Sequence, residues 1–259
     1  EETDAIGIYS SMQYSVSKTL PSLVINNAQH NSAFFESFED FRDLASLQAK
    51  YGGTFTFQPN YNSNITYTTT GRNCIGLGAN GTLEIPFVYT TDYDAAHGGE
   101  VILKFWASSW PTFDEVANAS LAVNPGATVE LLTNNLVTSS MATTRLATVG
   151  PWNLFQVKFS TSALTGGANV YKFRIKCNLT SSLTLDDIRY QPIRSAMKTY
   201  VYDAAKQRLL AEFGDDHMPT KYVYNLDGKL VRKMVYTEKG QMTILEGQYN
   251  NGFKDDRTQ

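Results

Sequence analysis

Alternating apolar and polar residues predict β-strands along most of the chain. In Tyr171–Cys177 every second residue is apolar and the three residues between them are cations, so one face is suited to a core and the other to solvent. Turn signals such as Asn80-Gly81 and Gly166-Gly167 separate segments of this kind between residues 54 and 192. Eight such strands favour a jelly-roll β-sandwich. The predicted strands are Thr54–Gln58, Cys74–Leu77, Thr82–Tyr89, Glu100–Ala107, Val129–Thr133, Leu154–Ser160, Tyr171–Cys177 and Leu183–Tyr190.

The C-terminal part carries a two-fold repeat. The tripeptides Tyr200-Val201-Tyr202 and Tyr222-Val223-Tyr224 start 22 residues apart, a period that predicts consecutive hairpins of a β-meander. Two repeats cannot bury a hairpin stack by themselves, so the last strand should present an open edge to a partner. The predicted strands are Thr199–Asp203, Arg208–Phe213, Lys221–Asn225, Lys229–Tyr236 and Gln241–Leu245.

The turns of the two repeats differ. The second repeat ends in Asn225–Gly228, where glycine can take a positive φ, and the segment Thr237–Gly240 should turn in the same way. The first repeat has Ala204–Gln207 at the corresponding place and no glycine. A type I turn or a wider loop is therefore expected there.

The pattern divides the chain into three parts. Residues 1–33 contain apolar residues without a lasting period, which predicts an extended lead-in segment that docks through one short strand. Residues 34–192 form the predicted sandwich, and residues 193–259 form the hairpin segment. One short helix is expected near residues 41–50, where apolar residues follow a helical spacing before Gly52-Gly53.

Composition supports a mostly β protein and excludes some partners. Aromatic residues make up 12% of the chain and charged residues 18%, with a formal net charge of −3 and no block of like charge. We therefore expect neither a nucleic-acid partner nor an anionic membrane surface. No apolar run approaches the ~20 residues of a membrane span. Residues 1–25 lack the pattern of a signal peptide, so a signal would have been removed or would lie elsewhere.

The two cysteines do not make a metal site. Cys74 and Cys177 lie about a hundred positions apart in strand-like stretches, with no neighbouring Cys or His. They are either a bridge between two strands or two small buried residues.

Catalytic patterns are missing from the sequence. His30, His97 and His217 fall in three separate regions, and no nucleophile elbow, HExxH motif or P-loop is present. Asp186 and Asp187 would point to opposite faces of a regular strand, so they could not form one acid–base couple for glycoside hydrolysis. A glycoside-active enzyme is the least favoured of three hypotheses.

A sugar-binding site needs exposed aromatic rings that stack on the sugar, with polar groups at the edge of the sugar. Trp110 lies where a loop should leave the sandwich, and Tyr93 lies in a polar loop with Asp92 and Asp94. These four residues are the predicted ligand contacts, although a half-buried position at the rim is an alternative for Trp110. Trp106 and Trp152 are assigned to the core instead.

Several short motifs resemble a known type of β-sandwich. Phe38-Glu39, the strand entry Thr70–Cys74, the strand Phe105–Ala107 and the closing Leu185–Arg189 are similar to those of carbohydrate-binding modules, as is a tryptophan before a late strand. A sandwich that runs directly into Tyr-Val-Tyr-Asp resembles the large RHS-like YD-repeat proteins of some Gram-negative bacterial surfaces. The resemblance extends over about residues 1–250, and the junction and the repeat are its most specific part.

The resemblance implies a site and a context. In carbohydrate-binding modules of this type, the Glu of the opening pair and an Asp of the closing pair commonly hold a structural calcium ion, which implies Glu39 and Asp186 as ligands of Ca²⁺. Two surface carboxylates that cap turns are the alternative.

The leading functional hypothesis is a non-enzymatic binding or adhesion module that is secreted or exposed on the outer face of a Gram-negative bacterium and binds a glycan or another surface component. The other hypothesis is a structural subunit or fragment of a larger secretion- or surface-associated complex. Such a part would bind protein rather than sugar, and it would join the larger protein assembly through its C-terminal β edge.

Overall fold

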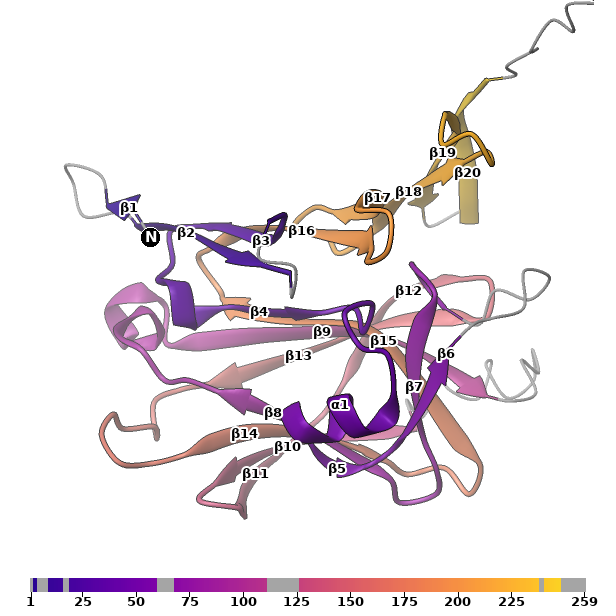
Figure 1. Cartoon of the computed structure of the whole chain (residues 1–259). Coiled ribbons are helices and arrows are strands. Elements are labelled where there is room, and N and C mark those ends of the chain that lie inside the picture. Colours follow the sequence, from indigo (N-terminus) through magenta and orange to yellow (C-terminus); the bar gives the residue numbers. More distant parts are fainter. Residues whose placement is uncertain are drawn as a thin grey trace, which may run out of the picture.

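A computed structural model describes residues 2–3, 9–15, 19–59, 68–110, 126–237 and 240–247. The described chain is nearly all β, and its strands form three antiparallel sheets that lie in layers (Figure 1). Its one α-helix, α1 (Leu44–Lys50), is short, as the sequence predicts. The predicted fold class, an all-β sandwich followed by an antiparallel meander, is confirmed.

Two of the sheets face each other and form the sandwich. The five-stranded sheet consists, in spatial order, of β11 (Leu136–Met141), β10 (Ala127–Thr133), β14 (Tyr171–Cys177), β8 (Thr82–Phe87) and β5 (Gly52–Thr54). The seven-stranded sheet consists of β12 (Thr144–Val149), β13 (Trp152–Ser160), β9 (Glu100–Trp110), β15 (Ser182–Pro192), β7 (Asn73–Leu77) and β6 (Thr56–Pro59), with β4 (Phe34–Glu36) paired to β15.

The sandwich core follows the predicted alternation. In β14 the apolar residues at every second position are buried and the cations between them are half-buried. The buried rings of Phe105 and Phe155 on the seven-stranded sheet lie 5.8 Å apart, and on the five-stranded sheet the buried ring of Phe173 packs against Phe87; all four belong to the apolar cluster between the two sheets. Burial of such rings is the main stabilising contribution to a sandwich of this kind.

The predicted turn at Asn80-Gly81 is confirmed, but it joins two sheets rather than two paired strands. Asn80 takes a φ of 59°, and the N–H of Gly81 donates to the carbonyl of Gly78 at 2.7 Å. The turn passes the chain from the seven-stranded sheet to the five-stranded sheet. Cys74 and Cys177 also lie in different sheets, and both are buried thiols that do not form a disulfide.

The third sheet is built from both ends of the described chain. Its strands, in spatial order, are β1 (Glu2–Thr3), β2 (Tyr9–Tyr14), β3 (Pro21–Asn26), β16 (Ala196–Asp203), β17 (Arg208–Phe213), β18 (Pro219–Tyr224), β19 (Leu230–Thr237) and β20 (Gly240–Glu246). The N-terminal part therefore holds more than the one short strand expected from the sequence. Leu23 and Ile25 of β3 are fully buried against the sandwich, and this alternation fixes β3 as a strand.

The first hairpin turn is the wider loop that the sequence leaves open. The N–H of Gln207 donates to the carbonyl of Asp203 at 2.7 Å, and Gln207 takes a φ of 53°. In the second repeat Gly228 takes a φ of 81°, as predicted for its turn. Residues 238 and 239 of the third turn lie outside the described residues.

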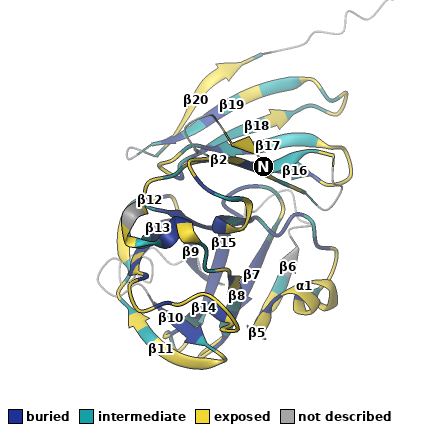
Figure 2. Ribbon diagram, turned by 90° about the vertical axis from the view of Figure 1, so that its left-hand side faces the viewer, coloured by how far each residue is buried: buried dark blue, intermediate teal, exposed yellow. Residues whose placement is uncertain are grey.

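The third sheet packs on the outer face of the seven-stranded sheet. A second apolar cluster fills this interface, and it contains both Trp106 and Trp152. The outward face and the free edge of the third sheet carry most of its exposure (Figure 2). The two tryptophans are core residues, as predicted, but they belong to this second interface rather than to the interior of the sandwich.

Three short 3-10 helices complete the described structure. They are His30–Ser32, Thr91–Tyr93 and Ala95–His97. Within the described ranges, no helix has the length and apolar character that crossing a membrane would require.

Candidate functional site

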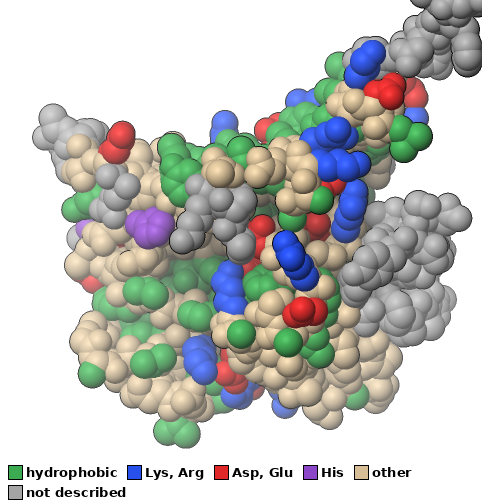
Figure 3. Space-filling model, in the orientation of Figure 1, with side chains coloured by type: hydrophobic (Ala, Val, Ile, Leu, Met, Phe, Trp, Pro, Cys, Tyr) green, Lys and Arg blue, Asp and Glu red, His purple; other side chains and the backbone are tan. Residues whose placement is uncertain are grey.

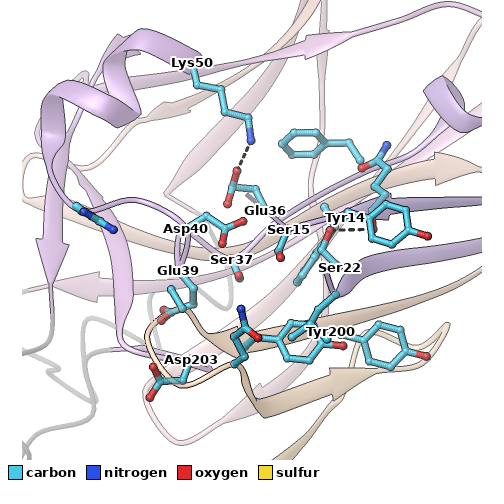
Figure 4. Close-up of a pocket in the computed structure, with 18 residues that line it drawn as sticks. Tyr14, Ser15, Ser22, Glu36, Ser37, Glu39, Asp40, Lys50, Tyr200 and Asp203 are labelled. Carbon is cyan, nitrogen blue, oxygen red and sulfur yellow. Dashed lines mark hydrogen bonds and ion pairs between the residues drawn. The ribbon is translucent and has the colours of Figure 1, made fainter. Parts of the chain in front are cut away.

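A pocket of about 640 Å³ opens between the third sheet and the segment 34–50 of the sandwich (Figure 4). It lies where β3 and β16 stop pairing. Their last paired residues are Leu23 and Thr199, whereas β16 continues to Asp203 beside β17. The pocket is lined by Gln13, Tyr14, Ser15, Leu20, Ser22, Phe34, Phe35, Glu36, Ser37, Glu39, Asp40, Arg42, Lys50, Tyr200, Tyr202, Asp203, Ala204 and Gln207.

Aromatic residues from three strands line the pocket. Tyr14 ends β2 and is 55% exposed. Tyr200 and Tyr202 on β16 stack on each other, with ring centroids 6.5 Å apart and an interplanar angle of 29°. Phe34 on β4 is stacked on Tyr190 of the sandwich core at 5.3 Å, which holds its ring in place. The pocket therefore contains rings whose positions are largely fixed before any ligand binds.

Acidic side chains form the opposite part of the lining. Glu36 accepts hydrogen bonds from the Lys50 ammonium at 2.8 Å, from the backbone N–H of Phe38 at 2.9 Å and from the hydroxyl of Tyr51. Asp203 forms an ion pair of 3.0 Å with Arg72. Figure 4 shows Glu36, Glu39 and Asp40 arranged along one side and Tyr200 and Asp203 on the other.

Glu39 is the most strongly perturbed carboxyl group of the lining. It is 8% exposed, and its Oε1 accepts the N–H groups of Arg72 at 2.6 Å and Asn73 at 2.7 Å. Burial raises its pKa to about 7, although the two N–H donors act in the opposite direction. A Cβ at Gly71 would lie 2.3 Å from Oε1, so only glycine permits this close approach.

Asp186 and Asp187 lie together, contrary to the expectation from a regular strand. The register of β15 shifts between Asp186 and Arg189, and Asp187 takes a φ of 46°, which marks a β-bulge. Thr70 contacts both side chains, since its N–H donates to Asp186 at 3.4 Å and its hydroxyl donates to Asp187 at 2.8 Å. Burial raises the pKa of both carboxyl groups, and their mutual repulsion adds to the pKa of Asp186.

This arrangement does not fit the implied calcium site. The N–H of Thr69 donates to Asp186 at 2.7 Å, and backbone N–H groups also occupy Oε1 of Glu39. These donors direct positive partial charge at the oxygens that a calcium ion would need. In the part of the chain that the structure describes, no group of three or more Asp, Glu, His or Cys side chains is arranged to hold a metal ion. Calcium binding by Glu39 and Asp186 stays a prediction of the resemblance.

Polar contacts fix the third sheet on the sandwich. The buried Arg189 of β15 donates to the carbonyls of Gly214 at 2.8 Å and Asp215 at 2.5 Å, in the loop between β17 and β18. The indole N–H of Trp106 donates to the carbonyl of His217 at 3.2 Å, and Nε2 of His217 lies 2.6 Å from the carbonyl oxygen of Asp187. Because the pocket lies between the two layers, these contacts also set its shape.

The ring of Tyr93, predicted to contact a ligand, is buried. Tyr93 is 1% exposed and donates its hydroxyl to the carbonyl of Ser32, so its ring cannot stack on a sugar. Asp92 accepts the N–H of Gln29 at 2.5 Å and the hydroxyl of Ser32, so Tyr93 and Asp92 fasten the loop to the N-terminal segment. Asp94 accepts the hydroxyl of Tyr89 at 2.7 Å. Ligand contacts of Asp92 and Asp94 stay predictions.

The structure leaves the predicted role of Trp110 untested. Trp110 is the last residue of β9, and its backbone is paired with Ser182. Its side chain lies outside the described residues, so a ligand contact through Trp110 stays a prediction.

Among the residues of the pocket, the sequence interpretation assigned only Glu39 to a binding site. The local sequence pattern near the pocket is the tripeptide Tyr200-Val201-Tyr202, which predicts a strand but not the cavity beside that strand. Tyr14 and Phe34 come from segments with no recognisable motif. The pairing of β2 with β3 and of β3 with β16 places Tyr14 near Tyr200, whereas Phe34 is placed by the pairing of β4 with β15.

Comparisons with known proteins give similarity to solved structures alone. No protein-family model and no curated protein matches the chain. The CBM22-1 xylan-binding domain of Paenibacillus barcinonensis Xyn10C is 10% identical, over 63% of this chain and 96% of that one, with a TM-score of 0.36. The CBM22-1-CBM22-2 tandem of the same protein is 10% identical, over 81% of this chain and 62% of that one, with a TM-score of 0.39.

A glycoside hydrolase is also similar in structure. The catalytic domain of a GH87 α-1,3-glucanase in complex with nigerose is 8% identical over 62% of this chain, with a TM-score of 0.34, and this chain spans 28% of that one. Similarity at these TM-scores does not identify a family or a ligand. The predicted RHS-like relationship has no family match and stays a prediction.

Proposed function

We propose that the chain is a non-enzymatic glycan-binding module and that the pocket beside β16 holds the sugar. The observation that carries this proposal is the combination of the rings of Tyr14, Phe34, Tyr200 and Tyr202 with fixed carboxylates in one cavity of about 640 Å³. Small-molecule sites are typically concave, with volumes of about 300–1,000 Å³ and a few oriented polar groups.

The chemistry of the lining matches the two kinds of surface on a sugar ring. The C–H face of a pyranose packs on an aromatic ring, and its hydroxyls exchange hydrogen bonds with charged groups at the edge. Glu36 and Lys50 are paired at 2.8 Å, and Asp203 is held by Arg72. Such held groups require little reordering when a hydroxyl replaces water.

The same contacts favour binding over catalysis. Protein partners hold the lining carboxylates: Glu36 is paired with Lys50, Asp203 with Arg72, and Glu39 accepts two backbone N–H groups. A glycosidase needs one carboxylic acid free to protonate the leaving group and a second carboxylate facing the sugar. We therefore expect binding without release of new reducing ends.

The test is affinity electrophoresis and calorimetry with xylan, mannan and α-1,3-glucan, the last including the disaccharide nigerose. Binding of at least one of them is expected, and Tyr14→Ala and Tyr200→Ala should each weaken it by about tenfold, or about 1.4 kcal/mol. Tyr93→Phe is the matched control, because its ring is buried away from the pocket. Unchanged binding in both pocket variants, or loss only in Trp110→Ala, would contradict the assignment of the pocket.

A second function is favoured by the free edge of the third sheet. Strand β20 is paired only with β19 among the described strands, and its apolar residues Met242, Ile244 and Leu245 are 47–54% exposed. Open apolar edges of this kind accept a further strand. If the chain works as a structural subunit that binds protein, Ile244→Lys should abolish association while Tyr14→Ala leaves it intact.

Two further predictions about context belong to this proposal. A glycan-binding module would act outside the cell, in agreement with the predicted secreted or surface location. An RHS-like parent protein would supply the strands that continue the sheet beyond β20.

A further inference from the structure

The two Tyr-Val-Tyr repeats place four tyrosines on one face of the third sheet. In β16 the residues Thr199, Val201 and Asp203 are buried towards the sandwich, so Tyr200 and Tyr202, which are half-buried, point to the opposite face. Tyr222 and Tyr224 of β18 are half-buried as well.

Glu212 shows that the tyrosines of the two strands share this face. Its backbone is in register with Tyr200, so both side chains project from the same side of the sheet. The hydroxyl of Tyr222 donates to Oε1 of Glu212 at 2.6 Å. The hydroxyl of Tyr224 donates to the carbonyl of Leu209, also on β17, at 3.0 Å.

We propose that Tyr200, Tyr202, Tyr222 and Tyr224 form a tyrosine track that continues the pocket across β16–β18 and binds the length of a polysaccharide chain. The module would then select an extended polymer over a short oligosaccharide. This inference rests on the proposed function, and it adds the class of ligand and a second group of contact residues.

Continuity with the pocket is the first support. Beyond Thr199, β16 has no pairing with β3, and the pocket lies at this gap in the sheet, so its lining includes both the buried Asp203 and the outward-pointing Tyr200 and Tyr202. Tyr200 and Tyr202 are stacked on each other, so a chain that leaves the pocket through the gap and over these rings next meets β17 and β18. Residues two apart on a strand are about 6.6 Å apart, and next-but-one strands about 9.6 Å. The track thus adds about 10 Å of aromatic surface beyond Tyr200.

Preorganisation of the rings is the second support. The Lys233 ammonium lies 5.1 Å from the centroid of the Tyr222 ring, and the Arg208 guanidinium lies 5.7 Å from that of Tyr224. Lys233 also lies 3.9 Å from Glu212. The track therefore alternates fixed rings with charged groups of both signs, a surface that suits the C–H faces and hydroxyls of a neutral polysaccharide.

Charge and polarity distinguish this occupant from a protein partner. A protein interface is typically depleted of charged residues at its centre, whereas Glu212 and Lys233 lie among the tyrosines of the track. Figure 3 shows acidic and basic side chains mixed with hydrophobic ones over the face in view, without a large patch of one sign.

The experiment compares a polymer with its own disaccharide, which is short enough to stay in the pocket. Calorimetry would use soluble mannan with mannobiose and soluble xylan with xylobiose. The wild-type protein should bind the polymer about tenfold more tightly per site than the disaccharide. Tyr222→Ala with Tyr224→Ala should remove this difference and leave disaccharide affinity unchanged. Tyr222→Phe is the control, because it retains the ring.

The outcomes separate this inference from the proposed function. If the disaccharide binds and Tyr14→Ala weakens its binding, but polymer affinity is the same with and without the track tyrosines, the track is wrong and the pocket stands. If the wild-type protein binds none of mannan, xylan and α-1,3-glucan, both are overturned. Should the double alanine variant fail to fold, Tyr222→Leu keeps apolar bulk on the strand without a flat ring, and it must also lose the polymer preference. Binding of a protein but no polysaccharide at the track would overturn the inference too.

Discussion

The two interfaces of the seven-stranded sheet have different chemistry. Its inner face packs on the five-stranded sheet through a cluster of apolar residues that includes Phe105, Leu103 and Phe155. Its outer face packs on the third sheet through a smaller apolar cluster with Trp106 at its centre, and buried polar groups lie beside this cluster. Neighbouring residues of β9 therefore belong to two different kinds of core.

The difference teaches what each interface contributes. An apolar interior gives stability that depends little on pH and tolerates changes of similar volume. Buried charged and polar groups such as Arg189 and His217 add little net stability, but they require one set of partners. The third sheet is thus held in one position on the sandwich, and this position also determines the shape of the pocket at its edge.

The largest expected effect comes from the adjacent residues Phe105 and Trp106, which are both fully buried. Phe105→Ala and Trp106→Ala should each lower the free energy of unfolding by about 3–5 kcal/mol, measured by urea denaturation. Hydrogen exchange should separate them. Trp106→Ala should speed exchange in β16 and β17 more than in β14, because the indole also donates to the carbonyl of His217. Equal loss of protection in all sheets would show that the two interfaces form one cooperative unit.

The next largest expected effect is a pH-dependent change of about 3 kcal/mol in the free energy of unfolding, which comes from Glu39. Its pKa is raised from 4.5 to about 7 by burial, so between these values the folded protein binds a proton that the unfolded chain has released. The contribution of Glu39 to stability is therefore greatest below pH 4.5 and is lost as the pH rises through about 7. As the pH rises from 5 to 8, the free energy of unfolding of Glu39→Gln should therefore increase by about 3 kcal/mol relative to that of the wild-type protein.

Bound calcium would make the wild-type protein, rather than Glu39→Gln, the more stable of the two at pH 8. Without metal, EDTA should leave the thermal midpoint unchanged and Glu39→Gln should be the more stable protein at pH 8. His217, whose pKa burial lowers, gives a slope of the opposite sign in both proteins, so it cancels in the difference. A midpoint that falls with EDTA in the wild-type protein but not in Glu39→Gln would establish the metal site that the resemblance implies.

The sequence predicts the strands well because their faces differ in polarity. All five strands of the hairpin segment occur within three residues of their predicted ends, and Arg208–Phe213 matches β17. Strands β11 and β12 were not predicted. Most of their residues are exposed, so neither shows the alternation that burial imposes.

The site could not be predicted in the same way, because no local pattern encodes it. The pocket lies where β16 extends beyond Thr199, the partner of Leu23, without pairing with β3, and this pairing is a long-range event between segments about 170 residues apart. Likewise, the bulge at Asp187 reverses the expected direction of one side chain, and nothing in Leu185–Arg189 signals it. Tyr93 looks like a loop residue, but its ring is buried because the N-terminal segment covers it.

The smallest expected effect lies at the hairpin turns, whose residues belong to neither of the two apolar clusters. Gln207 adopts a left-handed conformation, which costs a residue with a side chain about 1–2 kcal/mol, whereas Gly228 adopts the corresponding one at the second turn freely. Gln207→Gly should therefore stabilise the protein by up to about 1 kcal/mol after the entropy that glycine adds to the unfolded chain. Gly228→Ala should destabilise it by a similar amount, since a Cβ there would lie 2.1 Å from the Arg208 guanidinium.

Urea denaturation would measure both turn variants, and hydrogen exchange would locate the change. Only amides of β16–β19 should be affected, because the apolar cluster inside the sandwich includes no residue of these turns. If Gln207→Gly instead altered protection in β14, the turn would be coupled to the sandwich through the polar interface. The separation between a tolerant inner core and a specific outer one would then not hold.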